Sequence, residues 1–157
     1  MEAAYKAGKT RAIGVSNYCP SCFDCISDAT VVPHVNQVQY HVGEGVDPNG
    51  LKTYLDGKGI IMQAYSALSR GALIKSNITK AIGGAHNKSG AQVALRWVTQ
   101  QGVPLVTKAD DVEYLKEDLD CLDWDLTQDE MKQLDGTDCA AIGEKGSACQ
   151  PSYWCKQ

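Results

Sequence analysis

Three cysteines stand three residues apart near the start of the sequence, at Cys19, Cys22 and Cys25. Thiolates in such runs are ligands of zinc and iron–sulfur centres. A bacterial ferredoxin run would continue with a further cysteine and then a proline, but Ala29 and Thr30 stand at those places. A regular helix is expected here, and it would prevent the wrapped loop that a cluster needs. We therefore predict no metal site and interpret the cysteines as partly exposed thiols on a helix.

Other side chains capable of chemistry are scattered. The three histidines, His34, His41 and His86, fit no evident acid–base pairing. The seven cysteines are an odd number, so complete disulfide pairing would need a partner thiol. Because the chain is long enough to fold without covalent staples, we expect mostly reduced thiols and an intracellular protein.

Length and charge restrict the class of protein. The 157 residues make one domain, and 43% of them are hydrophobic, as in soluble globular proteins. A net charge of -4 argues against a nucleic-acid-binding surface. No apolar run reaches the roughly 18 residues of a membrane-spanning helix, so we expect a soluble protein without a transmembrane segment.

Short strand-like segments alternate with helical ones, which is typical of βα units around a parallel sheet. Strands are expected over 12–16, 35–40, 60–66 and 103–108. Helices are expected over 20–28, 49–56, 77–82, 89–100, 111–119 and 126–136. The last begins with a capping-box pattern, Thr127 with Glu130. No linker is evident, so we predict one domain over 1–138 followed by an irregular tail over 139–157.

Four segments carry a resemblance to a known family: RAIGVSNY (11–18), VNQVQYH (35–41), QAYSALSRG (63–71) and AQVALRWVTQQGVPLVTK (91–108). In this order and spacing they resemble the aldo-keto reductases. The family fold is a TIM (β/α)8 barrel, which binds NADPH in a groove at the C-terminal ends of its strands. The match is to the second half of that barrel. The expected fold is therefore α/β, the C-terminal half of a (β/α)8 barrel with four βα units.

The family's catalytic residues belong to the other half of the barrel. The resemblance implies a tetrad of Asp, Tyr, Lys and His, and none of the four has a counterpart here. His41 follows the second expected strand and is not the tetrad histidine. We therefore assign no catalytic residue, and we expect that the chain alone does not reduce carbonyls.

The resemblance places the nicotinamide end of the cofactor on four residues. Ser16, Asn17 and Gln37 would hydrogen-bond the carboxamide, and an asparagine amide supplies both donor and acceptor. Tyr65 would stack on the nicotinamide ring, which contributes about 0.5–1.5 kcal/mol beyond area burial. From the residues alone, Asn17 can equally cap the following helix, and Tyr65 can be a core aromatic.

The pyrophosphate would lie along the loop after the third strand. The resemblance matches Ser66 and Leu68 there, with Ser69 and Arg70 as further candidates. Backbone N–H groups and an arginine suit phosphate oxygens. The loop departs from the family pattern at two positions, since Ala67 stands where proline is usual and Ser69 where glycine is usual.

The adenosine end departs further from the family pattern. Lys108 and Glu117 match, whereas Ala109 replaces a serine, Tyr114 an arginine and Asp118 an asparagine. A 2′-phosphate would lose a hydroxyl and a planar cation and would meet an extra carboxylate. Each charge-assisted hydrogen bond is worth roughly 1.5–3 kcal/mol. NADP(H) binding should therefore be weakened by orders of magnitude.

Half a barrel leaves two sheet edges and one face uncovered. Val15, Val35, Ile61 and Val106 belong to the strands concerned. We expect a protein partner: an N-terminal half, a second copy, or a larger complex. Two functions stay open. The chain is either the cofactor-binding half of an NADP(H)-dependent carbonyl reductase, or a non-catalytic structural or assembly subunit descended from one.

Overall fold

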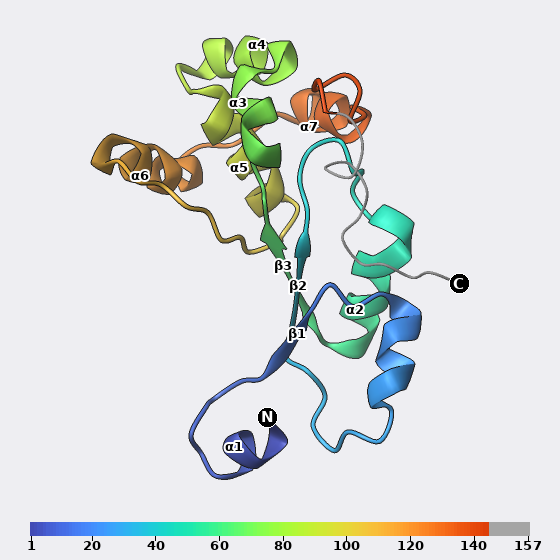
Figure 1. Ribbon diagram of the computed structural model, residues 1–157. Helices are drawn as coiled ribbons and strands as arrows, with labels where there is room; N and C mark the ends of the chain where they lie inside the picture. The colour runs from blue at the N-terminus through green and yellow to red at the C-terminus, as the bar shows by residue number, and fades with distance from the viewer. Residues whose placement is uncertain (145–157) are drawn as a thin grey trace.

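The computed structural model describes residues 1–144, in which three parallel strands have helices along one side and at both ends (Figure 1). The strands β1 (Gly14–Ser16), β2 (Val35–Gln39) and β3 (Ile61–Tyr65) pair in the order β1-β2-β3. In register, Val35 lies beside Gly14 on one side and Ile61 on the other. A helical segment follows each strand, so the predicted α/β class with a parallel sheet is confirmed.

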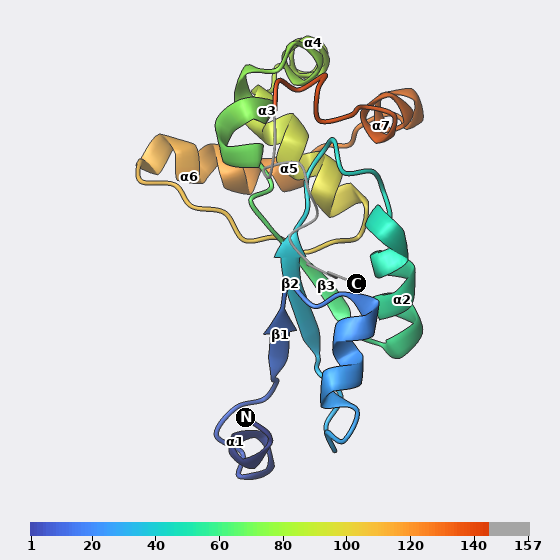
Figure 2. The same ribbon diagram turned by 45° about the vertical axis from the view of Figure 1, so that its right-hand side comes forward.

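The helical segments of this part of the chain are α1 (Glu2–Lys6), η1 (Pro20–Ile26), η2 (Pro48–Gly50), α2 (Leu51–Lys58), η3 (Ser69–Gly71), α3 (Ala72–Lys75), α4 (Asn77–His86), α5 (Gly90–Gln100), α6 (Val112–Leu119), η4 (Asp120–Leu122) and α7 (Gln128–Asp135), where η marks a 3₁₀ helix. In both views α1 lies at the N-terminal ends of the strands, and α3 to α6 gather toward their C-terminal ends (Figures 1 and 2).

The fourth predicted strand, over 103–108, is wrong in its extent. Ala64 of β3 makes one parallel bridge with Leu105. The Ala64 N–H donates to Pro104 O at 2.8 Å, and the Val106 N–H donates to Ala64 O at 2.9 Å. Pro104 has no N–H to extend the ladder, and within residues 1–144 no strand pairs on the far side of this segment. The described chain therefore has three strands and a bridged segment in place of four complete βα units.

The prediction of a regular helix over 20–28 is also wrong, because this segment forms the 3₁₀ helix η1. The Cys22 N–H donates to Cys19 O at 2.9 Å, which closes the tighter turn. Cys19 lies just before η1 as its N-cap, and this turn brings its Cα to within 5.0 Å of that of Cys22, to which it is disulfide-bonded. There are two smaller differences. The loop after the third strand contains the short helix α3, and the helix predicted over 77–82 continues to His86 as α4.

The helix ends follow their sequence signals. The predicted capping box of α7 is confirmed: the Glu130 N–H donates to Thr127 Oγ1 at 3.3 Å, and the Thr127 N–H donates to Glu130 Oε2 at 2.8 Å. Ser89 and Gln92 form a second capping box at α5. Gly59 ends α2 with φ 69°, a left-handed conformation that glycine adopts without strain. These caps fix where α5 and α7 begin.

The core lies between the sheet, α2 beside it and α5 toward the C-terminal ends of the strands (Figure 2). Val38 and Ala64 from the strands are fully buried there. Trp97 of α5 is also fully buried, and its ring stacks on Tyr40 with centroids 5.1 Å apart. Its Nε1 donates to Asp135 Oδ1 at 2.8 Å, so the indole joins α5 to α7 as well as to the sheet.

The opposite face of the sheet carries the alternate residues of each strand. Ile61 is 57% exposed there, and Val106 in the bridged segment is 42% exposed. Between these apolar side chains, Gln37 Nε2 donates to Gln63 Oε1 at 2.7 Å. Within residues 1–144 this face therefore has no covering layer that buries Ile61.

Two further findings concern the chain as a whole. None of the helices in residues 1–144 is long and apolar enough to cross a bilayer. The predicted tail over 139–157 is described only as far as Glu144, so most of it lies outside the described residues, and the boundary at 138 stays a prediction.

Candidate functional site

Residues with a left-handed backbone cluster where β1 and β3 end. Asn17 (φ 60°) follows β1, and Ser66 (φ 56°) follows β3. Ser69 (φ 46°) and Arg70 (φ 51°) lie in the turn that comes next. Such conformations cost non-glycine residues of order 1–3 kcal/mol each and gather at binding sites. Because the C-terminal ends of parallel strands meet at one edge, all four lie at the same end of the sheet.

Four residues predicted to hold the nicotinamide end of the cofactor come together at this edge. Ser16 Oγ donates to Gln37 O at 2.9 Å, and the Asn17 N–H donates to the same oxygen, also at 2.9 Å. Tyr65 Oη donates to Asn17 Oδ1 at 3.2 Å. The Asn17 amide is thus oriented by the tyrosine, and these contacts join β1, β2 and β3 at one place.

Gln63 is a neighbour that the sequence reasoning missed. It lies opposite Gln37 in the register and accepts that residue's amide hydrogen bond. Two positions before Tyr65, it points to the same face of β3. The sequence of β3 contained a signal for this residue. Side chains alternate between the two faces of a strand, and Gln63 is a polar residue on the same face as Ile61 and Tyr65.

The loop after β3 and the segment after Leu105 border a groove of about 430 Å³. Ser66, Leu68 and Arg70 line one side, and Lys108 lies on the other. Ser69 is only 1% exposed, and its Oγ has no hydrogen-bond partner. The groove therefore brings two cations to a loop of strained backbone, an arrangement suited to an anionic group.

A second groove of about 520 Å³ shares Leu68 and Lys108 with the first. Ala109, Tyr114, Glu117 and Asp118, all of the predicted adenosine end, line it. The two grooves are therefore adjacent, and together they extend from the end of β3 to α6. Neither groove is lined by Ser16, Asn17, Gln37 or Tyr65. The predicted residues therefore fall into these four, which we call the strand-end group, and a groove group made of those that line the two grooves.

The second groove is acidic. Lys108 Nζ donates to the Asp110 carboxylate, and both side chains are largely exposed. Glu117 Oε2 accepts a hydrogen bond from Ser89 Oγ at 3.0 Å, which fixes that carboxylate at the start of α5. Burial raises the pKa of the Asp118 carboxyl; a hydrogen bond with Thr107 lowers it, and the Glu117 charge raises it. Of the groove's charged groups, only Lys108 is a cation, and an acidic partner already engages it.

Comparison with known proteins decides the family. A sequence model described as the Aldo/keto reductase family matches residues 1–84, more than half of the chain. The chain belongs to the aldo/keto reductase family. The resemblance inferred from the four sequence segments is thereby confirmed.

Curated relatives and solved structures agree with this family. Glyoxal reductase of Bacillus subtilis (strain 168) is 38% identical over 136 residues, which cover 86% of this chain and 49% of the relative. An NAD(P)H-dependent pentose reductase of Pyricularia oryzae is 34% identical over 84% of this chain and 44% of its own. A crystal structure of a Gox0644 mutant in complex with NADPH superposes with TM-score 0.80 at 28% identity, covering 93% of this chain and 53% of that one.

This aldo/keto reductase chain thus spans about half the length of the curated relatives it matches. The aldose reductase of Schistosoma japonicum, with TM-score 0.78 and 26% identity, is matched over 92% of this chain and 46% of its own. The structural match covers nearly all of the described residues, so these residues have the fold of the corresponding half of the family's structures.

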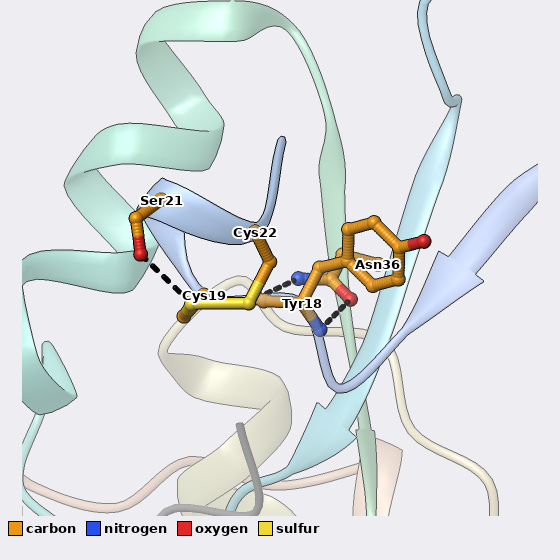
Figure 3. The surroundings of a disulfide bond; sticks show 5 residues. All are labelled: Tyr18, Cys19, Ser21, Cys22 and Asn36. Carbon is orange, nitrogen blue, oxygen red and sulfur yellow. Dashed lines mark hydrogen bonds between the residues drawn. A yellow bond between two sulfur atoms is a disulfide. The ribbon is translucent and has the colours of Figure 1, made fainter. Parts of the chain in front are cut away.

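The cysteine run of this family member holds a disulfide. Cys19 and Cys22 are bonded, with their Cα atoms 5.0 Å apart (Figure 3). Cys25 is a free and exposed thiol, whereas Cys121 is free and buried. The expectation of mostly reduced thiols is therefore wrong for the first pair, because the 3₁₀ turn brings them together. Within residues 1–144 no group of three or more His, Cys, Asp and Glu side chains is arranged to hold a metal ion.

The histidines have partners that the sequence reasoning did not find. His86 Nε2 contacts Glu130 Oε1 at 2.8 Å, a pairing across α4 and α7. In the loop after β2, His41 Nε2 lies 3.9 Å from Glu44 Oε1, and both side chains are fully buried. Gln39 Nε2 donates to Glu44 Oε1 at 2.9 Å. Neither contact was evident from the sequence, because both depend on tertiary packing.

Replacing buried Glu44 with glutamine should change how stability depends on pH. Burial raises the pKa of Glu44, although His41 and the hydrogen bond from Gln39 act against this. The folded state then holds the proton more tightly than the unfolded one. The resulting stability is fully present below the unfolded pKa of about 4.3 and is lost as pH rises through the folded pKa. In urea titrations from pH 4 to 7, the wild type should lose stability relative to Glu44→Gln. A difference that is flat across this range would contradict the burial effect.

Proposed function

We propose that this chain is the cofactor-binding half, the C-terminal half barrel, of an NADP(H)-dependent reductase of carbonyls. The observation that carries the proposal is the convergence of Ser16, Asn17 and Tyr65 at the C-terminal ends of β1 and β3, with the Gln37 carbonyl of β2 bonded to the first two. A groove with Arg70 and Lys108 on its two sides begins directly after Tyr65. A flat amide-bearing ring followed by an anionic group fits this order of side chains.

The strand-end group fits the nicotinamide part of the cofactor. Asn17 has an amide N–H₂ to donate, and its oxygen is oriented by Tyr65 Oη. When bound, the cofactor supplies a hydride. The residues of this chain would bind and orient it, and we assign none of them a catalytic role.

The groove group fits the 2′-phosphate of NADP(H) less well. Ala109 has no hydroxyl, Tyr114 is no cation, and Asp118 adds a carboxylate. The cofactor would therefore be held mainly at its nicotinamide and pyrophosphate ends, by Ser66, Leu68 and Arg70. Lys108 and Glu117 would contribute at the adenosine end only after Lys108 leaves Asp110.

We further propose that a partner supplies the catalytic Asp, Tyr, Lys and His and covers the open face of the sheet. The exposure of Ile61 and Val106 supports this, since soluble proteins rarely leave a sheet face with large apolar side chains uncovered. An N-terminal half, a second copy or a larger complex would each bury this face.

Fluorescence titration with NADPH tests the first proposal. The chain alone should bind with a Kd near the millimolar range, about -4 kcal/mol. Asn17→Ala should weaken binding at least about threefold, whereas the matched change of an exposed asparagine, Asn77→Ala at the start of α4, should leave the Kd unchanged. No binding at about millimolar NADPH would refute the cofactor-binding half.

Restoring the family pattern should strengthen binding of the phosphorylated cofactor selectively. The triple variant Ala109→Ser, Tyr114→Arg, Asp118→Asn adds a hydroxyl and a planar cation and removes a carboxylate. We expect NADPH affinity to rise by at least about tenfold, or 1.4 kcal/mol. NADH, which lacks the 2′-phosphate, is the matched control and should change by less than about threefold. Equal gains for both cofactors would contradict the proposed position of the adenosine end.

A second candidate function is a non-catalytic subunit of a larger assembly. Exposed apolar side chains favour it: Val112, Leu115 and Leu119 of α6 are 64%, 48% and 72% exposed and recur at helical spacing. Native mass spectrometry of protein purified from its source distinguishes the candidates. A complex with no NADPH binding supports the subunit, whereas a monomer without a partner excludes it.

A further inference from the structure

The Cys19–Cys22 disulfide lies one residue away from the strand-end group. Tyr18 is the residue between Asn17 and Cys19, and the buried Asn36 of β2 holds its backbone from both sides (Figure 3). Asn36 Nδ2 donates to Tyr18 O at 2.8 Å, and the Tyr18 N–H donates to Asn36 Oδ1 at 3.3 Å. The turn that presents Asn17 is thus held by Asn36 on one side and by the disulfide on the other.

The two sulfurs differ in access. Cys19 is only 1% exposed, and its Sγ lies 3.4 Å from Ser21 Oγ. Cys22 is half-buried at the edge of the core. Three residues further along η1, Cys25 carries a free, exposed thiol. A thiol arriving from solvent therefore reaches Cys22 before Cys19.

The bond joins residues only three positions apart. A disulfide restricts the unfolded chain less as the loop that it closes becomes shorter. The fold around η1 also has other contacts that keep it in place, because Phe23 packs edge-on to Tyr18 and against Tyr54. The domain can therefore remain folded when this disulfide opens, which is what a reversible redox site requires.

We propose that Cys19–Cys22 is a thiol–disulfide exchange site that accepts two electrons from a dithiol, and that its reduction frees the Asn17–Tyr18 turn. One thiolate of the dithiol attacks Cys22 Sγ, the S–S bond breaks, and Cys19 Sγ leaves as a thiolate and takes up a proton. The second thiolate of the reductant then displaces Cys22, which is also protonated. The dithiol ends as a disulfide, and the protein has gained two electrons and two protons.

Differential alkylation tests the exchange. The full chain is incubated with dithiothreitol under native conditions, quenched with acid, alkylated in denaturant and mapped by peptide. Without reductant only Cys25 and Cys121 should be labelled among residues 1–144; after reduction Cys19 and Cys22 should be labelled together. In the matched variant Cys25→Ser, Cys19 and Cys22 should be labelled as in the wild type, before and after reduction. Labelling of both before reduction, or of neither until the protein is unfolded, would overturn the site.

Hydrogen exchange tests the release of the turn without any cofactor. The Tyr18 amide should exchange about tenfold faster after reduction, which corresponds to 1.4 kcal/mol. Amides of α7 should not change. The variant Cys22→Ser should exchange quickly in both states, and unchanged exchange in the reduced wild type would overturn the release. Reduction should change NADPH affinity only if the proposed function is right. If the Tyr18 amide exchanges faster after reduction but NADPH affinity does not change, the result counts against the proposed function and not against the release of the turn.

Discussion

Replacing Trp97 with alanine is expected to lower the free energy of unfolding by about 3–5 kcal/mol. The indole is fully buried and stacks on Tyr40, so its removal leaves a cavity between α5 and the sheet. Asp135 also loses the donor Nε1, although Gln101 Nε2 still donates to the same oxygen at 2.8 Å. Because small domains have only about 5–15 kcal/mol of stability, a large part of the total would be lost. Urea denaturation followed by circular dichroism measures it.

Trp97→Phe separates packing from the hydrogen bond. Phenylalanine keeps an aromatic ring against Tyr40 but cannot donate to Asp135, so we expect a smaller loss of roughly 1–3 kcal/mol. Lys132→Ala, at an exposed position of α7, serves as control and should stay within about 0.5 kcal/mol. A loss below about 1 kcal/mol for the alanine variant would contradict a central place for Trp97 in the core.

The fold was predictable where local patterns determine it. The apolar spacing of Val93, Ala94, Trp97 and Val98 predicts α5, and all four side chains are fully buried. The extent of the strand predicted over 103–108 could not be read from its own residues, because a strand forms only where neighbouring strands pair with its edges. Pro104 and the lack of a further paired strand in residues 1–144 leave only one bridge there.

The site was predictable only in part. The resemblance selects Asn17 and Tyr65, but their hydrogen bond joins residues 48 positions apart, which no local pattern contains. The disulfide was missed because a regular helix was expected over 20–28, whereas the Cys22 N–H donates to Cys19 O in a tight 3₁₀ turn that brings the two residues together. Glu44 was missed because an acidic loop residue is usually exposed, and its burial depends on how the loop folds back over β2.

Gly83 and Gly84 are neighbours in α4, and alanine is expected to change stability in opposite directions at the two positions. A Cβ on Gly83 would stand 2.3 Å from the carbonyl oxygen of Lys88. The backbone of Lys88 is held beside Gly83, because the Lys88 N–H donates to Gly83 O at 2.8 Å. Backbone must therefore move, and we expect Gly83→Ala to lose about 1–3 kcal/mol. At exposed Gly84 no atom lies within 4 Å, and Gly84→Ala should gain about 0.5–1 kcal/mol.

The pair isolates the effect of space, because both substitutions remove the same glycine flexibility from the same helix. The strain at Gly83 also reaches the groove: Lys88 precedes Ser89, whose hydroxyl holds Glu117 at 3.0 Å. Gly83→Ala should therefore lower thermal stability and speed amide exchange at the start of α5, whereas Gly84→Ala should do neither. If both substitutions stabilised the protein equally, the turn from α4 to α5 could move away from the new Cβ. The close approach of Gly83 to the Lys88 carbonyl would then not fix the position of Ser89.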